Sequence, residues 1–387
     1  MMVKSYEEIN AKLRSGKAVV LTAAEVAEMG RTATPAEIVE KVDVVTTATF
    51  GAMCSSGAII NFGHADPPIR MEKIRINGVP VYEGLAAVDG YIGATACDPD
   101  HPEYGGAHVI QDLLEGKTLE LEAWGKGTDC YPRKHIKTTI SLDTVNEVYL
   151  FNPRNAYQNY NVAINTTKRL IHTYMGTLLP GLRNATYSTS GELSPLLNDP
   201  EMRTIGIGTR ILLGGARGYV VWPGTQYNTS KPVNTHGIPV GNARTIAVIG
   251  NLKEMSPDFL QAAYIDKYGT TLFMGIAIPI PVLDEDIARR VTIRDDQIET
   301  AILDYGSPGT PRLGQTTYAQ LRSGHITVEG KKVRTAPVAS LAKARQLADL
   351  LRQQLLAGTF EITRPVEMFP AQASLRSLKE TETEEQP

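Results

Sequence analysis

The stretch VVTTATFGAMCSSGAIINFGHADPP, residues 44–68, holds the clearest structural and chemical signal in the chain. It begins as a run of β-branched residues that is typical of a buried strand, and small residues then surround a single cysteine, Cys54. A strand that leads into a loop of small residues leaves backbone N–H groups free to face an anion, and a thiolate is such an anion. Cys54 is therefore the first candidate for a nucleophile. The alternative is an inert buried thiol, because free cysteine is among the most buried residue types.

Helices and strands are predicted to alternate on both sides of this stretch. Before it, Thr22–Glu25 and Thr34–Glu37 match the capping box, and Pro35 occupies the favoured first position of the second helix. Alternation of this kind predicts an α/β fold in which mixed sheets carry flanking helices. Elsewhere we predict helices at 5–13, 108–114, 256–267 and 340–356, strands at 18–21, 119–124, 162–168, 219–222, 245–249 and 272–280, and hairpins around 77–78 and 329–330.

The predicted organisation is one large catalytic unit, residues 1–365, followed by a partly disordered C-terminal tail, residues 366–387. The end of this tail, from Lys379 to Pro387, is acidic and has no apolar anchor, which is typical of disorder. No internal repeat or low-complexity linker marks a further boundary in the sequence.

Composition and charge limit the kinds of partner that the protein can have. The chain of 387 residues is 42% hydrophobic and has a net charge of −3, so it has no basic footprint for nucleic acid and suits small-molecule substrates. The N-terminus lacks the apolar segment of a signal peptide, and no apolar run approaches the roughly 18 residues of a membrane span. We therefore expect a cytoplasmic protein. Three cysteines without a C-x-x-C pair are too few for a disulfide framework, which leaves reactive thiols.

A second cysteine, Cys130, has a different local context. It follows a glycine-rich turn and precedes Arg133, Lys134 and His135. Positive neighbours of this kind favour the thiolate form of a cysteine. The alternative is a solvated basic loop, because runs of charge usually face water.

Two segments in the middle of the chain are rich in asparagine or glycine. The asparagines between Asn152 and Asn161 either cap turns or bind a polar substrate. The glycines between Gly206 and Gly218 match neither the dinucleotide-binding fingerprint nor the P-loop, so we interpret them as close backbone packing beside a site.

Six spaced motifs carry a further signal. They are KVDVVTT at 41–47, MCSSG at 53–57, GLAAVD at 84–89, GAT at 93–95, GGAHVI at 105–110 and GIGTR at 206–210, the last followed by a glycine pair at 214–215. In this combination they resemble the homocysteine-biosynthesis protein family over about residues 5–365. The characterised activity of that family is L-aspartate semialdehyde sulfurtransferase, so the resemblance implies sulfur assimilation in an anaerobe.

The resemblance also implies a reaction and its partners. L-Aspartate 4-semialdehyde takes up sulfur from a protein persulfide and is reduced to L-homocysteine, the precursor of methionine. The two functional cysteines of the family fall on Cys54 and Cys130 of this sequence. The implied partners are a sulfide or persulfide donor and a ferredoxin-like electron donor protein, and we expect a homo-oligomer.

The chemistry of the implied reaction sets further requirements. Conversion of an aldehyde and sulfide to a thiol needs two electrons, and the sequence has no evident flavin or nicotinamide motif. We therefore expect no bound cofactor apart from a transient persulfide on Cys54, together with an external reductant. Cys130 would attack the Cys54 sulfur and leave a disulfide. This mechanism predicts that the two cysteine loops share one cavity with at least one arginine.

Binding of the substrate carboxylate calls for a cation, and guanidinium has the best geometry for that task. His64 and His108 are candidates for proton transfer, although a histidine in an apolar context is often structural. The candidate arginines are Arg70, Arg133, Arg154, Arg210 and Arg217.

Two other hypotheses remain open at this stage. In the first, Cys54, Cys97 and Cys130 hold an iron–sulfur cluster with one open iron that binds sulfide, although their spacing matches no cluster motif. In the second, the protein is a non-catalytic subunit that binds a sulfur-carrying partner.

Overall fold

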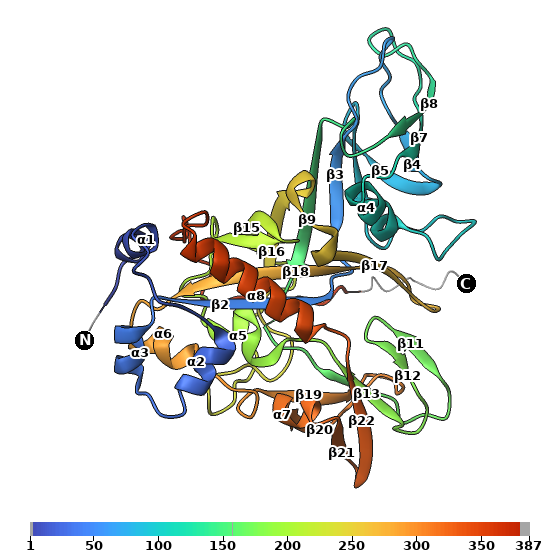
Figure 1. Cartoon of the computed structure of the whole chain (residues 1–387). Coiled ribbons are helices and arrows are strands. Elements are labelled where there is room, and N and C mark those ends of the chain that lie inside the picture. Colours follow the sequence, from blue (N-terminus) through green and yellow to red (C-terminus); the bar gives the residue numbers. More distant parts are fainter. Residues whose placement is uncertain (1–2, 157, 380–387) are drawn as a thin grey trace.

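The computed structural model describes residues 3–156 and 158–379, and Figure 1 shows it as a mixed α/β fold. Within these residues there are a fourteen-stranded sheet, a six-stranded sheet and a two-stranded sheet. The predicted α/β class with mixed sheets and flanking helices is confirmed.

The fourteen-stranded sheet runs through the centre of the molecule and into the upper part of Figure 1. Its strand order is β1-β2-β18-β14-β15-β16-β9-β3-β6-β5-β4-β7-β8, and β17 pairs with β18. Its strands are β1 (Val20–Thr22), β2 (Val44–Ala52), β3 (Gly57–Asn61), β4 (Lys73–Ile76), β5 (Val79–Ala86), β6 (Asp89–Gly93), β7 (Leu119–Trp124), β8 (His135–Ile140), β9 (Glu147–Asn155), β14 (Arg210–Leu213), β15 (Ala216–Pro223), β16 (Ile246–Asn251), β17 (Leu260–Ile265) and β18 (Gly269–Pro281).

The six-stranded sheet lies in the lower part of the same view, and the two-stranded hairpin stands beside it. The six strands, in the order β20-β19-β10-β13-β22-β21, are β10 (Val162–Ile164), β13 (Asn184–Tyr187), β19 (Glu299–Asp304), β20 (Arg312–Thr317), β21 (His325–Val328) and β22 (Lys331–Pro337). The hairpin consists of β11 (Ile171–Thr173) and β12 (Gly176–Leu178).

Helices cover the sheets at several places. They are α1 (Tyr6–Arg14), α2 (Ala23–Met29), α3 (Pro35–Lys41), α4 (Gly106–Leu114), α5 (Pro195–Asn198), α6 (Glu285–Arg290), α7 (Tyr318–Arg322) and α8 (Leu341–Leu356), with 3₁₀ turns η1 (Gly191–Leu193), η2 (Leu252–Glu254) and η3 (Pro257–Phe259). None of the helices in the described ranges is both long and apolar enough to cross a membrane.

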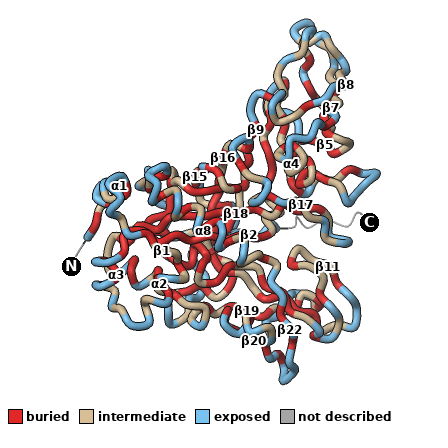
Figure 2. Tube along the Cα trace, viewed as in Figure 1, coloured by how far each residue is buried: buried red, intermediate tan, exposed pale blue. Residues whose placement is uncertain are grey.

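Strand β2 is the centre of the larger hydrophobic core. It pairs with β18 along its whole length, and α8 packs across both strands, so eight of its nine residues are buried. The side chains of Leu347, Leu351 and Leu355 on α8 are fully buried against this surface. Each such leucine contributes about 1.5–3 kcal/mol through burial. Figure 2 shows the resulting buried band through the middle of the molecule.

The six-stranded sheet has a hydrophobic cluster of its own, separate from the cluster around β2. Tyr318 on α7 is completely buried in this second cluster, with Val162 and Ile302 from its central strands. The described residues therefore form two main cored halves, with a smaller third cluster under the β11–β12 hairpin, and a site can form where the two halves meet.

Most of the predicted elements are confirmed. The capping boxes at Thr22 and Thr34 are formed as predicted, α8 begins after Ser340, and the hairpins around 77–78 and 329–330 are present. Residue ranges 119–124 and 245–249 are strands, apart from a one-residue difference at the start of the second.

Two predicted elements are wrong in type or length. The segment 256–267 is not a helix: Ser256 caps only a 3₁₀ turn, and β17 then pairs with the first half of β18. The long open edge of β18 outweighs the local helix signal, because pairing there satisfies a row of backbone groups. The predicted strand 162–168 ends at Ile164, because the side chain of Asn165 accepts hydrogen bonds from Thr167 and starts a turn.

The first part of the predicted tail is attached to the body. The backbone N–H of Val366 donates to the carbonyl of Ile207, and Phe369 is buried. Farther on, the N–H of Ala373 donates to the Thr229 hydroxyl. Residues 380–387, which include most of the acidic stretch, lie outside the described residues.

Candidate active site

Cys54 lies in a tight turn between β2 and β3. The N–H of Ser56 donates to the carbonyl of Met53 at 3.0 Å, and the Ser56 hydroxyl donates to the same oxygen at 2.6 Å. The N–H of Met53 donates to Leu272 on β18, which ties the turn to the central sheet. Gly57 ends the turn, and a Cβ there would lie 2.3 Å from the Tyr91 hydroxyl. Close packing therefore requires a glycine at position 57.

Two hydroxyl groups donate hydrogen bonds to the sulfur of Cys54. The Thr271 hydroxyl lies 3.2 Å from Sγ, and the Tyr268 hydroxyl lies 3.5 Å from it. Burial, together with the neighbouring Cys54 sulfur, raises the pKa of Tyr268 above its ordinary value. Tyr268 thus keeps its proton while it faces the sulfur, and both donors are placed to solvate negative charge on Sγ.

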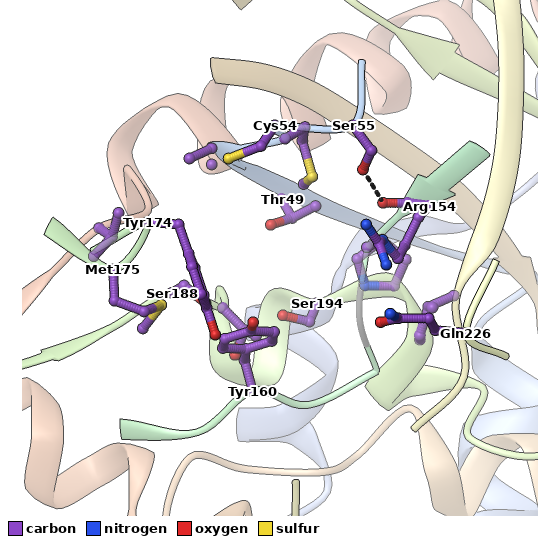
Figure 3. A pocket seen from close by; sticks show the side chains of 18 of the residues that line it. Thr49, Cys54, Ser55, Arg154, Tyr160, Tyr174, Met175, Ser188, Ser194 and Gln226 are labelled. Carbon is purple, nitrogen blue, oxygen red and sulfur yellow. Dashed lines mark hydrogen bonds between the residues drawn. The ribbon is translucent and has the colours of Figure 1, made fainter. Parts of the chain in front are cut away.

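The sulfur faces a cavity of about 310 Å³, which is near the lower end of the range of ligand pockets. Its walls come from β2 and the Cys54 turn, from β9, from the segment around η1 and α5, and from the β11–β12 hairpin (Figure 3). The lining residues are Thr49, Gly51, Ala52, Met53, Cys54, Ser55, Arg154, Ala156, Tyr160, Tyr174, Met175, Ser188, Thr189, Ser194, Pro195, Leu196, Gln226, Tyr268 and Val338.

Of the five arginines that the sequence analysis proposed for the substrate carboxylate, only Arg154 is among the described residues that line the cavity. It lies near the end of β9 on the same side of the cavity as Gln226, as Figure 3 shows. In the described part of the chain no carboxylate pairs with its guanidinium group. Its positive charge lowers the pKa of Tyr268, against the larger effect of burial, so the two side chains interact across the cavity.

A buried asparagine holds Arg154 and the Cys54 turn together. The side-chain oxygen of Asn152 accepts a hydrogen bond from the Arg154 N–H at 2.7 Å, and its amide nitrogen donates to the Ser56 hydroxyl at 2.8 Å. Asn159 similarly donates to two backbone carbonyls, those of Pro239 and Glu299. These two asparagines therefore position the backbone, as in the turn-capping interpretation of the segment, and do not line the cavity.

Tyrosines form the side of the cavity opposite Arg154. The Tyr174 ring, at the tip of the β11–β12 hairpin, lies 6.2 Å from the Tyr160 ring and 6.2 Å from the Tyr268 ring. Its hydroxyl is 2.8 Å from that of Tyr305. Below the tip, His172 Nδ1 lies 3.7 Å from Asp266 Oδ2 in the β17–β18 turn. The hairpin thus contacts the turn that carries Tyr268.

Cys130 is not part of this cavity. It is exposed in the loop between β7 and β8, where the Tyr131 ring stacks on His64 and Arg133 pairs with Ile69 in a short bridge. Cys54 precedes β3 and His64 follows it, and β3 alone spans about 13 Å at 3.3 Å per residue. The prediction that both cysteine loops share one cavity with an arginine is therefore wrong within a single chain. The Cys54 loop shares a cavity with Arg154, and the Cys130 loop does not.

The other predicted substrate-binding residues lie outside the cavity lining. Arg133 donates to the backbone carbonyls of Asp66 and Pro67, and Arg210 donates to the carbonyl of Glu361. The remaining candidates are exposed and do not line the cavity; they are His64, Arg70 and Arg217.

His108 has a structural role at the start of α4. Its Nδ1 accepts a hydrogen bond from the Gly105 N–H, and its ring stacks on Tyr104. Burial lowers the pKa of His108, which favours the neutral ring that this contact needs.

The three cysteines do not gather as iron–sulfur ligands would. Cys97 lies beside Thr270, with 3.7 Å between the sulfur and the hydroxyl oxygen, whereas Cys54 contacts the next residue, Thr271. Successive side chains of a strand point to opposite faces, so Cys97 and Cys54 lie on different sides of β18. Among the described residues no group of three or more histidine, cysteine, aspartate or glutamate side chains is arranged to hold a metal. This donor set does not fit a cluster.

Several site residues escaped the sequence analysis. Tyr268 lies in the β17–β18 turn and Thr271 near the start of β18, between the predicted helix 256–267 and the predicted strand 272–280, where we predicted no element. Tyr174 belongs to a segment that gave no clear prediction. The only sequence signal near Tyr268 and Thr271 was the predicted buried strand 272–280. That signal could not show that this strand lies beside the strand leading to Cys54.

Comparison with known proteins shows the family to which the chain belongs. The sequence model of a family described as "Homocysteine biosynthesis enzyme, sulfur-incorporation" matches residues 18–362. The chain belongs to this family. A protein of Methanosarcina acetivorans named L-aspartate semialdehyde sulfurtransferase is 49% identical over 99% of this chain and 75% of its own length. A protein of Methanocaldococcus jannaschii with the same name is 50% identical over 95% of this chain and 73% of its own length. No solved structure matches the chain.

Proposed function

We propose that this member of the homocysteine-biosynthesis family is an L-aspartate semialdehyde sulfurtransferase that carries sulfur as a persulfide on Cys54. The observation that carries the proposal is the Cys54 sulfur itself, which accepts two hydroxyl hydrogen bonds and faces a cavity that holds Arg154. The names of the two archaeal relatives agree with this activity.

The cavity suits a short aldehyde that carries a carboxylate. Arg154 offers a planar fork of N–H donors to the carboxylate, and such bidentate pairs are strong and directional. The aldehyde then lies at the sulfur end of the cavity. Serine and threonine hydroxyls from the η1 segment and β2 are available to the amino group.

The reaction balances in four steps. The terminal sulfur of the persulfide attacks the aldehyde carbon, and the carbonyl oxygen takes a proton, which gives a hydroxyalkyl disulfide on Cys54. Two electrons and two protons cleave the S–S bond and free the Cys54 thiol. Loss of water gives a thioaldehyde, and two more electrons and two protons reduce it to homocysteine. An external reductant therefore supplies four electrons when sulfur arrives at the oxidation level of a persulfide.

The partners follow from these steps. A persulfide or polysulfide donor loads Cys54 directly, whereas sulfide loads it only together with a two-electron oxidant, and a ferredoxin-like protein supplies electrons, with no cofactor resident in the chain. Cys130 lies outside the cavity, so any attack on the Cys54 sulfur comes from Cys130 of a neighbouring subunit in a homo-oligomer. We place these reactions in the cytoplasm.

A single-turnover experiment tests the proposal. Polysulfide-treated protein is desalted and its intact mass is measured, and L-aspartate 4-semialdehyde is then added with titanium(III) citrate. We expect wild type and Cys97→Ser to gain one sulfur and to release homocysteine, and Cys54→Ser to do neither. Homocysteine formation by Cys54→Ser at the wild-type rate would overturn the assignment and favour a non-catalytic sulfur-binding subunit.

A further inference from the structure

The two hydroxyl groups at the Cys54 sulfur have different surroundings. Thr271 is fully buried within β18, and among the described residues the only hydrogen-bond partner of its hydroxyl is Cys54. Tyr268 lies three residues earlier in the β17–β18 turn and is 38% exposed. One donor is thus fixed by the sheet, and the other stands where the cavity meets solvent.

The position of Tyr268 is set by its turn and by the hairpin opposite. Lys267 and Gly269 both have positive φ values, 56° and 123°, so the chain reverses sharply around Tyr268. The Tyr174 ring lies 6.2 Å from the Tyr268 ring, and His172 reaches Asp266 in the same turn. These contacts aim the phenol of Tyr268 at the sulfur.

Tyr268 is suited to hold a proton beside a reacting anion. Its pKa is raised by burial and by the neighbouring sulfur, so the phenol stays protonated at neutral pH. A persulfide places its terminal sulfur one S–S bond, about 2.05 Å, beyond Sγ. An aldehyde attacked by that sulfur then has its oxygen within reach of a phenol that already lies 3.5 Å from Sγ.

We propose that Tyr268 is the general acid of the carbon–sulfur bond-forming step and that Thr271 is the positioning residue for the Cys54 sulfur. This inference rests on the proposed sulfurtransferase function. The terminal sulfur donates its electron pair to the aldehyde carbon, the C=O π pair moves to oxygen, and this oxygen takes the Tyr268 proton. The phenolate regains a proton from solvent through its exposed side, and no oxidant or reductant is consumed in this step.

The test separates sulfur loading from carbon–sulfur bond formation. Tyr268→Phe keeps the ring and its contact with Tyr174 but removes the hydroxyl. We expect this variant to reach full loading of one sulfur on Cys54, although more slowly than wild type because one hydrogen bond to the sulfur is lost, so its later steps can be measured from the loaded protein. Its single-turnover rate with aspartate semialdehyde should fall by about 10²-fold or more, the usual contribution of a general acid, with little change in KM.

A second readout distinguishes proton donation from packing. The wild-type single-turnover rate should show a solvent deuterium isotope effect and no dependence on buffer concentration, whereas the Tyr268→Phe rate should rise with the concentration of an acidic buffer, which replaces the phenol as proton donor. Tyr264→Phe, a matched change at an exposed tyrosine of β17, should leave the rate and the isotope effect unchanged.

Thr271 is tested by a conservative pair of variants. Thr271→Val should slow both alkylation of Cys54 by iodoacetamide and sulfur loading by about tenfold, since one hydrogen bond to a charged sulfur is lost. Thr271→Ser keeps the hydroxyl and should restore both rates. Equal behaviour of the valine and serine variants would overturn the positioning role.

The outcomes also separate this inference from the proposed function. If Tyr268→Phe loads sulfur and turns over within threefold of wild type, the inference fails and the sulfurtransferase assignment stands. If wild type itself loads no sulfur and makes no homocysteine, the proposed function fails.

Discussion

The loops that carry Cys54 and Cys130 show how similar sequence signals can have different structural meanings. Both follow a strand and both are flanked by glycine. The Cys54 loop lies between the two cored halves, where two hydroxyls reach its sulfur and a cavity opens before it. The Cys130 loop is exposed at the end of the β7–β8 hairpin. The two thiols therefore differ in the residues that pack around them from distant parts of the sequence, and not in the residues next to them in the chain.

The positive neighbours of Cys130 illustrate the point. Arg133 is engaged with the carbonyls of Asp66 and Pro67, and His135 lies 3.0 Å from a Glu122 oxygen. Two of the basic residues that favoured Cys130 in the sequence are therefore engaged elsewhere, Arg133 with the 66–67 backbone and His135 with Glu122. The solvated-loop interpretation describes the Cys130 segment better within a single chain.

Removal of Arg154 should give the largest effect on the Cys54 side of this comparison. Arg154→Met loses two charge-assisted hydrogen bonds to the substrate carboxylate, so we expect kcat/KM for aspartate semialdehyde to fall by about a hundredfold or more. Sulfur loading should be unchanged, because it does not involve the carboxylate.

A substrate analogue provides the control for Arg154. 3-Aminopropanal lacks only the carboxylate, so wild type should use it as poorly as Arg154→Met uses the full substrate, and the variant should hardly distinguish the two aldehydes. A variant that still prefers aspartate semialdehyde by a hundredfold would show that another group binds the carboxylate.

A change at Cys130 should have a much smaller effect when a chemical reductant is present. Cys130→Ser should load sulfur on Cys54 fully and turn over within about threefold of wild type with titanium(III) citrate, because the reductant replaces any resolving thiol. Steady-state homocysteine formation and intact mass measure the two steps.

Mixing of variants sharpens this result. If Cys130 acts from a neighbouring subunit, Cys130→Ser is slow with a protein electron donor alone, and co-folding it with Cys54→Ser restores about a quarter of wild-type activity in a two-fold dimer. A Cys130→Ser variant that cannot load sulfur even with excess polysulfide would contradict the placement of Cys130 outside the cavity.

The smallest effect is expected at His108, another residue that the sequence offered for catalysis. Its pKa is lowered in the folded state, so the unfolded chain binds more protons, and this residue's contribution to stability is lost as pH falls below about 6.5. Glutamine at this position of α4 can still cap Gly105. At pH 8 the free energy of unfolding of His108→Gln should lie within about 0.5 kcal/mol of the wild-type value. Between pH 8 and pH 5.5 the variant should lose less of this free energy than wild type does, as measured in urea melts. A large loss of kcat at pH 8 would contradict the structural role.

The sequence predicted those parts of the fold that depend on local signals. Capping boxes at Thr22 and Thr34, the turn at Asn77-Gly78 and the apolar face of α8 each act within a few residues, and each is present. The segment 256–267 failed because pairing with a distant strand outweighed its local helix signal. Cys54 was found because its strand and turn are contiguous.

The site residues beyond Cys54 depend on strand order. Arg154 could not be ranked among five arginines, because its place beside the cavity results from the pairing of β9 with β3 and β16. Tyr268 and Thr271 reach the sulfur only because β18 lies next to β2. No local sequence pattern predicts that β18 lies beside β2, and a tyrosine or a threonine does not by itself indicate a site.

The contact between the β11–β12 hairpin and the β17–β18 turn has a consequence for timing. The hairpin stands with the smaller half of the molecule, whereas the turn that carries Tyr268 and the Cys54 loop both belong to the larger half, because β18 pairs with β2. An opening between the halves therefore separates the Tyr268 ring from Tyr174 and leaves the turn beside Cys54; such movements take microseconds to milliseconds. We expect the Tyr268 phenol to be held toward the sulfur only while the halves are closed, so a sulfur stored on Cys54 waits until the hairpin has closed over a seated substrate.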